Sequence, residues 1–200
     1  VDEMINKIRK AREKGCTTIL MQGGLNSNIP FNFYTEIVSR TVKEFPDITP
    51  HFFSAPEIMK MTEVSGLSIK EVFQELKKAG QRTMPGGGSE ILTNEIKSKI
   101  SRFKPKNSVD QWTDVHRNAH EVGIYTTATM MYGHLEKDED IIETLSHIRN
   151  VQDEAIKSKP AKFTAFIPWS FKKDNTALGK KIITEAGPNQ YLRIIAISRI

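Results

Sequence analysis

Hydrophobic residues along the chain follow two spacings: short continuous runs, and stripes that recur every three or four positions. The short runs are rich in β-branched residues and predict strands over residues 17–21, 48–53, 82–84, 124–131 and 163–169. The stripes predict helices over residues 2–14, 33–45 and 138–155, helices that begin near Glu57, Ser68, Thr93 and Ser108, and two helical segments after residue 175. The chain therefore alternates five strands with helices.

Capping residues mark several helix ends. Ser68 is followed three positions later by Glu71, and this pair forms a capping box that begins a helix. Gly80 and Gly123 come directly after apolar stripes, where a helix commonly ends in a left-handed glycine. The acidic residues at 136 and 138–140 suit the positive end of a helix dipole. These signals support the alternation of strands and helices.

This alternation predicts an α/β fold class with a parallel sheet in a single domain. Near-continuous apolar strands are typical of parallel sheets that helices cover. Right-handed crossovers place the carboxyl ends of all the strands at one rim. The pattern does not decide between an open sheet and a barrel. A Gly-x-Gly-x-x-Gly turn, the signature of dinucleotide-binding folds, does not follow the first predicted strand.

The turns at the five strand ends form the predicted ligand site. They lie at residues 22–24, 54–57, 86–90, 133–136 and 168–170. Ordering three consecutive glycines, Gly86, Gly87 and Gly88, costs conformational entropy. Their use at a strand end indicates either a flexible lid or the close approach of a ligand.

Charged residues recur at these turns. Glu57, Glu90 and Glu136 each lie near a helix start, where capping alone explains a carboxylate, but the recurrence favours a functional role. His51 lies at a strand end, and His134 follows the turn at Gly133. A lone histidine at such a position is more often structural than catalytic, so His51 is only a candidate.

Composition narrows the classes of function. The net charge is +5, but the basic residues are spread along the chain, which argues against nucleic acid as a partner. No apolar run approaches the roughly 18 residues of a membrane span. Cys16 is the single cysteine, so an internal disulfide is excluded, and His116 and His120 have no obvious further metal ligand. We therefore predict no metal site within the chain and expect a cytoplasmic location.

The rim segments resemble a known family. Residues 22–24, 51–58, 80–92, 126–136 and 166–169 are similar, in the same order, to the radical S-adenosylmethionine enzymes of menaquinone and deazaflavin biosynthesis. The runs at 81–88 and 128–134 point to the cyclising member of the futalosine pathway to menaquinone, with aminofutalosine synthase and the deazaflavin synthase subunits as the near alternatives. The resemblance covers nearly the whole chain.

The resemblance implies a fold, two cofactors and a set of cofactor-binding residues. The implied fold is a partial (β/α)6 barrel of the radical-SAM TIM-barrel type, and the implied cofactors are S-adenosyl-L-methionine and a [4Fe-4S] cluster. The first glycine motif would bind the methionine amino group, and the run from 129 to 136 would lie near the adenine and ribose. The implied cofactor-binding residues are Gln22, Gly23, Gly24, Ser54, Thr129, Met131, Gly133 and Glu136.

The implied substrate is dehypoxanthine futalosine, from which a 5′-deoxyadenosyl radical would remove a ribose hydrogen before a ring closes onto the aromatic group. The implied substrate-binding residues are Arg82, Gly86, Gly87, Gly88, Ser89 and Trp169. Among them, Arg82 and Ser89 are candidates for the substrate's benzoate. The base that takes the final proton stays open among Glu90, Glu57 and His51. The implied protein partner is a reductant such as flavodoxin or ferredoxin.

One departure from the family pattern is large. The family binds its cluster through Cys-x-x-x-Cys-x-x-Cys, and this chain contains only Cys16. We expect the cluster-binding βα unit to lie upstream of Val1, so that residues 1–200 form one partial-barrel domain of a longer enzyme and are inactive alone. Two alternatives are an α/β binding domain without a cluster, and a (β/α)-barrel lyase. The lyase requires a lysine at a strand end, and Lys172 is the nearest.

Overall fold

The computed structural model describes residues 1–101, 104–182 and 185–200. Its strands are β1 (Thr18–Met21), β2 (Thr49–Phe52), β3 (Thr83–Met84), β4 (Tyr125–Tyr132) and β5 (Phe163–Ser170). They form one sheet in the order β1-β2-β3-β4-β5, and every neighbouring pair is parallel. The predicted parallel α/β fold is confirmed.

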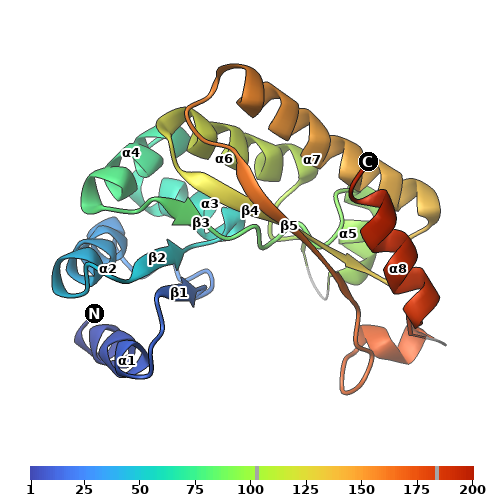
Figure 1. Cartoon of the computed structure of the whole chain (residues 1–200), viewed down its shortest axis with the longest axis horizontal. Coiled ribbons are helices and arrows are strands. Elements are labelled where there is room, and N and C mark those ends of the chain that lie inside the picture. Colours follow the sequence, from blue (N-terminus) through green and yellow to red (C-terminus); the bar gives the residue numbers. More distant parts are fainter. Residues whose placement is uncertain (102–103, 183–184) are drawn as a thin grey trace.

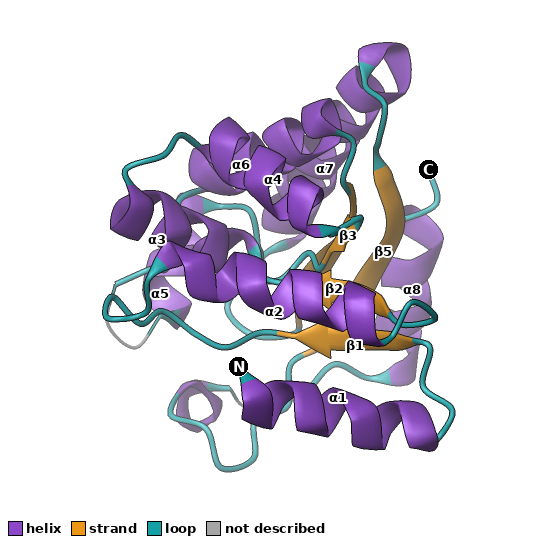
Figure 2. Ribbon diagram, turned by 90° about the vertical axis from the view of Figure 1, so that its left-hand side faces the viewer, coloured by secondary structure: helices purple, strands orange, loops and turns teal. Residues whose placement is uncertain are grey.

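Helices follow the strands along one side of the curved sheet (Figure 1). They are α1 (Asp2–Glu13), α2 (Phe31–Glu44), α3 (Ala55–Ser65), α4 (Ile69–Ala79), α5 (Asn94–Ile100), α6 (Val109–Val122), α7 (Asp138–Ser158) and α8 (Pro188–Ile197), with a 3₁₀ turn η1 (Leu178–Lys181). Figure 2 shows α2 in front of β1 and β2, so the helical layer covers the sheet from this side.

The main core lies between the sheet and this helical layer. Phe52, Met84 and Ala128, from three neighbouring strands, are completely buried there, together with Ile37 of α2 and Trp112 of α6. Strand side chains alternate between the two faces of a sheet. The residues between these buried positions therefore lie on the opposite face.

That opposite face is exposed along the described chain. Leu20 of β1 is 64% exposed and Trp169 of β5 is 45% exposed, and Tyr125 and Ile167 are also large exposed residues. Each of them alternates with a more deeply buried neighbour on its own strand. The helical layer therefore leaves this face, and the rim above it, open to a ligand.

The predicted caps form as expected. Ser68 and Glu71 make a reciprocal capping box at the start of α4, and Gly80 ends this helix with a φ of 114°. Gly123 ends α6 in the same left-handed region, with a φ of 90°. Because these stops are local, the helix boundaries could be predicted closely from single residues.

The predictions for the last part of the chain need two corrections. The predicted turn at 168–170 is wrong, because β5 continues to Ser170 and pairs with β4 to its end. Pro168 is tolerated there since β5 is the edge strand, where a missing N–H breaks no second ladder. Of the two helical segments predicted after residue 175, α8 is confirmed and the other is only the short turn η1.

Candidate active site

The Glu57 carboxylate joins the carboxyl ends of β1 and β2. Its Oε1 accepts a hydrogen bond from the Gly23 amide at 2.7 Å. Its Oε2 accepts bonds from the Ser54 amide at 2.8 Å and from the Ser54 hydroxyl at 2.7 Å. Glu57 is only 3% exposed. Because three donors occupy this buried carboxylate, Glu57 serves to position the two strand ends.

Each glycine of the triplet lies against a different neighbour, and backbone or ring atoms leave no room for a Cβ at Gly86 and Gly88. A Cβ on Gly86 would lie 2.3 Å from the backbone oxygen of Thr127, and one on Gly87 would lie 2.5 Å from Nε2 of Gln22. Gly88 has a φ of +87°, and its Cβ would lie 2.6 Å from the Pro56 ring. The triplet therefore packs closely between the ends of β1, β2 and β4. Close packing within the protein, rather than a flexible lid, explains the three glycines.

Hydrogen bonds from hydroxyl groups connect the loop at residues 86–89 to β4. The Gly86 amide donates to Oγ1 of Thr127 at 3.0 Å, and Oγ1 of Thr129 donates to the Gly86 carbonyl at 3.0 Å. The Ser89 hydroxyl donates to the Thr129 carbonyl at 2.5 Å, and Ser89 is completely buried. Ser89 and Thr129 thus fix the loop, and their predicted contacts with substrate and cofactor stay predictions.

A second carboxylate fixes the turn after β4. Glu136 accepts hydrogen bonds from the amides of Gly133 at 2.5 Å and His134 at 2.8 Å. The Leu135 amide lies 2.7 Å from Nδ1 of His134, which must therefore be the acceptor, so Nε2 carries the proton that bonds the Met131 carbonyl at 3.1 Å. Burial lowers the pKa of His134, which keeps the ring neutral. Glu136 is therefore part of a rigid strand end.

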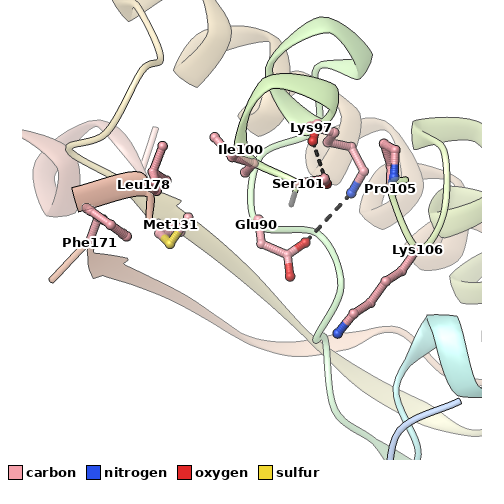
Figure 3. Close-up of a pocket in the computed structure, with 9 residues that line it drawn as sticks. All are labelled: Glu90, Lys97, Ile100, Ser101, Pro105, Lys106, Met131, Phe171 and Leu178. Atoms are coloured by element: carbon pink, nitrogen blue, oxygen red, sulfur yellow. Dashed lines mark hydrogen bonds and ion pairs between the residues drawn. The ribbon is translucent and has the colours of Figure 1, made fainter. Parts of the chain in front are cut away.

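Two cavities adjoin at this rim. The first has a volume of about 270 Å³ and brings together six residues of the predicted site: Gln22, Gly24, Ser54, Glu57, Gly88 and Glu90. The second has a volume of about 290 Å³ and includes the predicted Met131 (Figure 3). Glu90 and Lys106 line both cavities. The predicted site is therefore centred on Glu90.

Ten of the predicted residues line neither cavity, and three of them, Arg82, His51 and Trp169, also lie outside the turns of the rim. Arg82 precedes β3, and its guanidinium donates to the carbonyls of Lys77 and Gln81, at the end of the sheet opposite the glycine triplet. His51 is half-buried within β2 beside Thr83, and burial lowers its pKa. Trp169 lies on the exposed face of β5. The structure does not bring these side chains together with Glu90.

Sequence reasoning missed a buried lysine under the glycine triplet. The Lys97 ammonium donates to the carbonyls of Gly88 at 2.8 Å and Ser89 at 3.1 Å, and lies 3.8 Å from the Glu90 carboxylate. Burial lowers the pKa of Lys97, and Glu90 opposes this shift. The sequence does indicate that Lys97 shares one helix face with Ile100 and Ser101, three and four residues later, and both of these residues line the same cavity as Lys97.

Comparison with known families defines the class of protein. The Radical SAM superfamily pattern matches residues 1–148, so the chain belongs to the radical SAM superfamily. Residues 160–200 match the CofH/MqnC C-terminal region, which relates the chain to that group within the superfamily. The family resemblance predicted from the rim motifs is confirmed.

Curated relatives lie in the same group. A cyclic dehypoxanthine futalosine synthase of Halalkalibacterium halodurans is 41% identical over the whole chain, which covers 52% of that relative. A second relative, 38% identical, is a 5-amino-6-(D-ribitylamino)uracil–L-tyrosine 4-hydroxyphenyl transferase of Methanosarcina barkeri. A third, 34% identical, is an aminodeoxyfutalosine synthase of Thermus thermophilus. Both matches cover the whole chain and 52% of the relative. The chain thus spans about half the length of the curated relatives it matches.

A solved structure supports the fold. The crystal structure of HydG, a maturase of the [FeFe]-hydrogenase, superposes with a TM-score of 0.71 over 97% of this chain and 41% of that chain, at 15% sequence identity. At this identity the likeness concerns the fold alone. No helix in the described ranges combines the length and apolar character needed to cross a membrane.

Superfamily membership implies S-adenosylmethionine and a [4Fe-4S] cluster as cofactors. The residues at the first cavity fit the aminoacyl end of S-adenosylmethionine, because Gln22 offers an amide oxygen to its ammonium and Lys106 offers a positive charge to its carboxylate. The cluster ligands are not among these 200 residues: the one cysteine, Cys16, is exposed and precedes β1, at the opposite end of the strand from the rim.

Proposed function

We propose that this chain forms the cofactor- and substrate-binding part of a radical SAM enzyme that converts dehypoxanthine futalosine into its cyclic form in menaquinone biosynthesis. The observation that carries the proposal is 41% identity, over the whole chain, to a cyclic dehypoxanthine futalosine synthase. In this superfamily S-adenosylmethionine supplies a 5′-deoxyadenosyl radical that removes a hydrogen atom from the substrate. Cytoplasmic location and a flavodoxin or ferredoxin reductant belong to the same proposal.

The chain's own contribution is to hold a rigid cradle around the reacting groups. Glu57 and Glu136 fix the ends of β1, β2 and β4 through backbone amides. The glycine triplet and Ser89 close the space between these ends. Such a cradle orients the substrate and excludes water, which lowers the barrier for a reaction between two bound molecules.

Glu90 is the favoured acceptor for the proton that leaves the substrate ring. Its side chain is 39% exposed and lies at the junction of the two cavities, with Lys97 3.8 Å away. The competing Glu57 has both oxygens occupied by hydrogen-bond donors. His51 lies outside both cavities. Accessibility therefore favours Glu90 among the three candidate bases.

A parallel assay of two substrate sets tests this proposal. The full-length protein, reconstituted anaerobically with iron and sulfide, is incubated with S-adenosylmethionine, a reductant and one substrate set at a time. We expect dehypoxanthine futalosine to give a product lighter by two hydrogen atoms, since one is abstracted and one leaves as a proton and an electron. Consumption of 5-amino-6-(D-ribitylamino)uracil with L-tyrosine instead would contradict the proposal and support the transferase alternative. A protein that binds S-adenosylmethionine but acts on neither set would favour a binding domain.

A further inference from the structure

Lys97 is a buried charge in the wall of the second cavity. It belongs to α5, and its side chain is only 4% exposed, whereas the Glu90 side chain that faces it is 39% exposed. Burying an ammonium group costs free energy unless hydrogen bonds and an opposite charge compensate for it. A methionine would fill the same space without this cost. A lysine at this position therefore indicates a role beyond packing.

The Lys97 ammonium holds three consecutive residues of one loop. It donates hydrogen bonds to the carbonyls of Gly88 at 2.8 Å and Ser89 at 3.1 Å, and it lies 3.8 Å from Oε2 of Glu90. Figure 3 shows the ammonium and the Glu90 carboxylate facing each other in the cavity wall. Lys97 therefore connects both the backbone before Glu90 and the Glu90 side chain to the same helix.

The backbone of Glu90 adopts a conformation that needs such support. Glu90 has a φ of 39°, in the left-handed region that non-glycine residues rarely adopt. Its carbonyl accepts a hydrogen bond from the Met131 amide at 2.5 Å. A residue in a rare conformation persists where its surroundings hold it firmly, and such residues cluster at functional sites. Lys97 of α5 and Met131 of β4 hold Glu90 from two sides.

The second oxygen of the Glu90 carboxylate is left for a ligand. Oε1 makes no hydrogen bond or ion pair with any residue that the structure describes, and it points away from Lys97 (Figure 3). Glu90 lines both cavities, so this oxygen lies where they adjoin. Glu57 differs, because donors occupy both of its oxygens. The Glu90 carboxylate is thus fixed on one side and open on the other.

We propose that Lys97 is a positioning residue for Glu90, which fixes the loop backbone and one carboxylate oxygen so that the other oxygen faces the substrate. The inference rests on the proposed function in taking Glu90 as the proton acceptor. Lys97 acts through Glu90 and not on the substrate itself. Because a misplacement of about 1 Å can cost about 100-fold in rate, the loss of Lys97 should lower kcat more than it changes KM.

Hydrogen exchange at the Met131 amide tests the positioning without turnover. This amide reports on the Glu90 backbone, because the Glu90 carbonyl accepts its hydrogen bond. In the full-length protein, we expect Lys97→Met to speed exchange of this amide about 10-fold or more, and Lys97→Arg, which keeps the charge and the donors, to restore protection. Lys99→Met is the matched control, because Lys99 lies on the same helix, is exposed and pairs with Glu95. An unchanged exchange rate in Lys97→Met would overturn the inference.

A double-mutant cycle on turnover separates this role from a purely structural one. With the reconstituted full-length protein and dehypoxanthine futalosine, Lys97→Met should lower kcat about 10-fold or more and leave KM within about 2-fold. In the Glu90→Gln background, Lys97→Met should cause no further loss of kcat, because the group that it positions is already absent. An equal loss in both backgrounds would overturn the inference, since Lys97 would then act independently of Glu90.

The two measurements distinguish a failure of this inference from a failure of the proposed function. A protein that does not cyclise dehypoxanthine futalosine would refute the proposed function, and exchange at the Met131 amide would still decide whether Lys97 holds Glu90. Cyclisation with an equal kcat loss in both backgrounds would overturn this inference alone. Should Lys97→Met not fold, Lys97→Gln takes its place with the same expectations, because it loses the charge that faces Glu90 and keeps a donor for one carbonyl.

Discussion

Two buried histidines should make the stability of this fold depend on pH. His116 and His120 are completely buried on α6, and both contact the Thr126 hydroxyl of β4, His116 through Nδ1 at 3.0 Å and His120 through Nε2 at 2.8 Å. The Phe163 ring packs against both imidazoles. Burial lowers the pKa of His120 from 6.5 to about 4, and it lowers the pKa of His116 as well. Both rings are therefore neutral in the folded protein near pH 7.

The size of the effect follows from proton linkage. The unfolded chain protonates His120 as the pH falls through 6.5, whereas the folded protein does so only near 4, so stability is complete above 6.5 and is lost below it. On going from about pH 8 to about pH 5, the free energy of unfolding changes only below the unfolded pKa of 6.5. The remaining roughly 1.5 pH units, at about 1.36 kcal/mol each, amount to a loss of about 2 kcal/mol from His120 alone. The surface carboxylates titrate mainly at lower pH, so this window isolates the histidines.

Urea unfolding at the two pH values measures this loss. The variant His120→Gln should show about 2 kcal/mol less pH dependence of the unfolding free energy than the unaltered protein, because glutamine does not titrate. His147→Gln is the control for the substitution itself, since His147 lies near the surface of α7 beside Glu143 and its loss removes no buried imidazole. An identical pH dependence in His120→Gln and the unaltered protein would refute the linkage.

The remaining predictions concern the rim. Gly86→Ala should destabilise the protein by about 3 kcal/mol or more, because its Cβ would meet the backbone of β4. Gly187→Ala should be tolerated, because a Cβ there would have nothing within 4 Å, and thermal unfolding of the two variants measures the difference. Glu90→Gln should lower kcat for cyclisation at least about 100-fold with unchanged S-adenosylmethionine affinity, and an unchanged kcat would exclude Glu90 as the base. Lys97→Met should cost about 1–3 kcal/mol of stability, since two buried carbonyls lose their donor, and chemical denaturation measures it. Arg82→Met should leave KM within about 2-fold, and a larger change would place Arg82 in the substrate site.

Features governed by local chemistry could be predicted from the sequence. The capping box of Ser68 and Glu71 determines where α4 begins, and Gly80 determines where it ends. The five apolar runs became the five strands, and the parallel order placed the turns that follow β1, β2, β3 and β4 at one rim. Six of the predicted site residues consequently line one cavity.

Features governed by tertiary contacts could not be predicted. Lys97 lies in a helix with several charged residues, and only the path of the glycine triplet over α5 buries it. Pro168 predicts a turn because a proline is disfavoured inside a sheet, but the edge position of β5 removes that constraint. The positive charge of Arg82 makes it a candidate partner for the substrate's benzoate in the sequence, but Arg82 precedes β3 and so lies at the other end of the sheet from Gly86.

The central claim is that this rim places a substrate ribose hydrogen beside the 5′-deoxyadenosyl group, and an isotope experiment tests it most directly. The reconstituted full-length protein is incubated with S-adenosylmethionine, a reductant and dehypoxanthine futalosine deuterated on the ribose, and 5′-deoxyadenosine is analysed by mass spectrometry. The account predicts that 5′-deoxyadenosine gains deuterium in proportion to the cyclic product. Unlabelled 5′-deoxyadenosine formed alongside the cyclic product would contradict it.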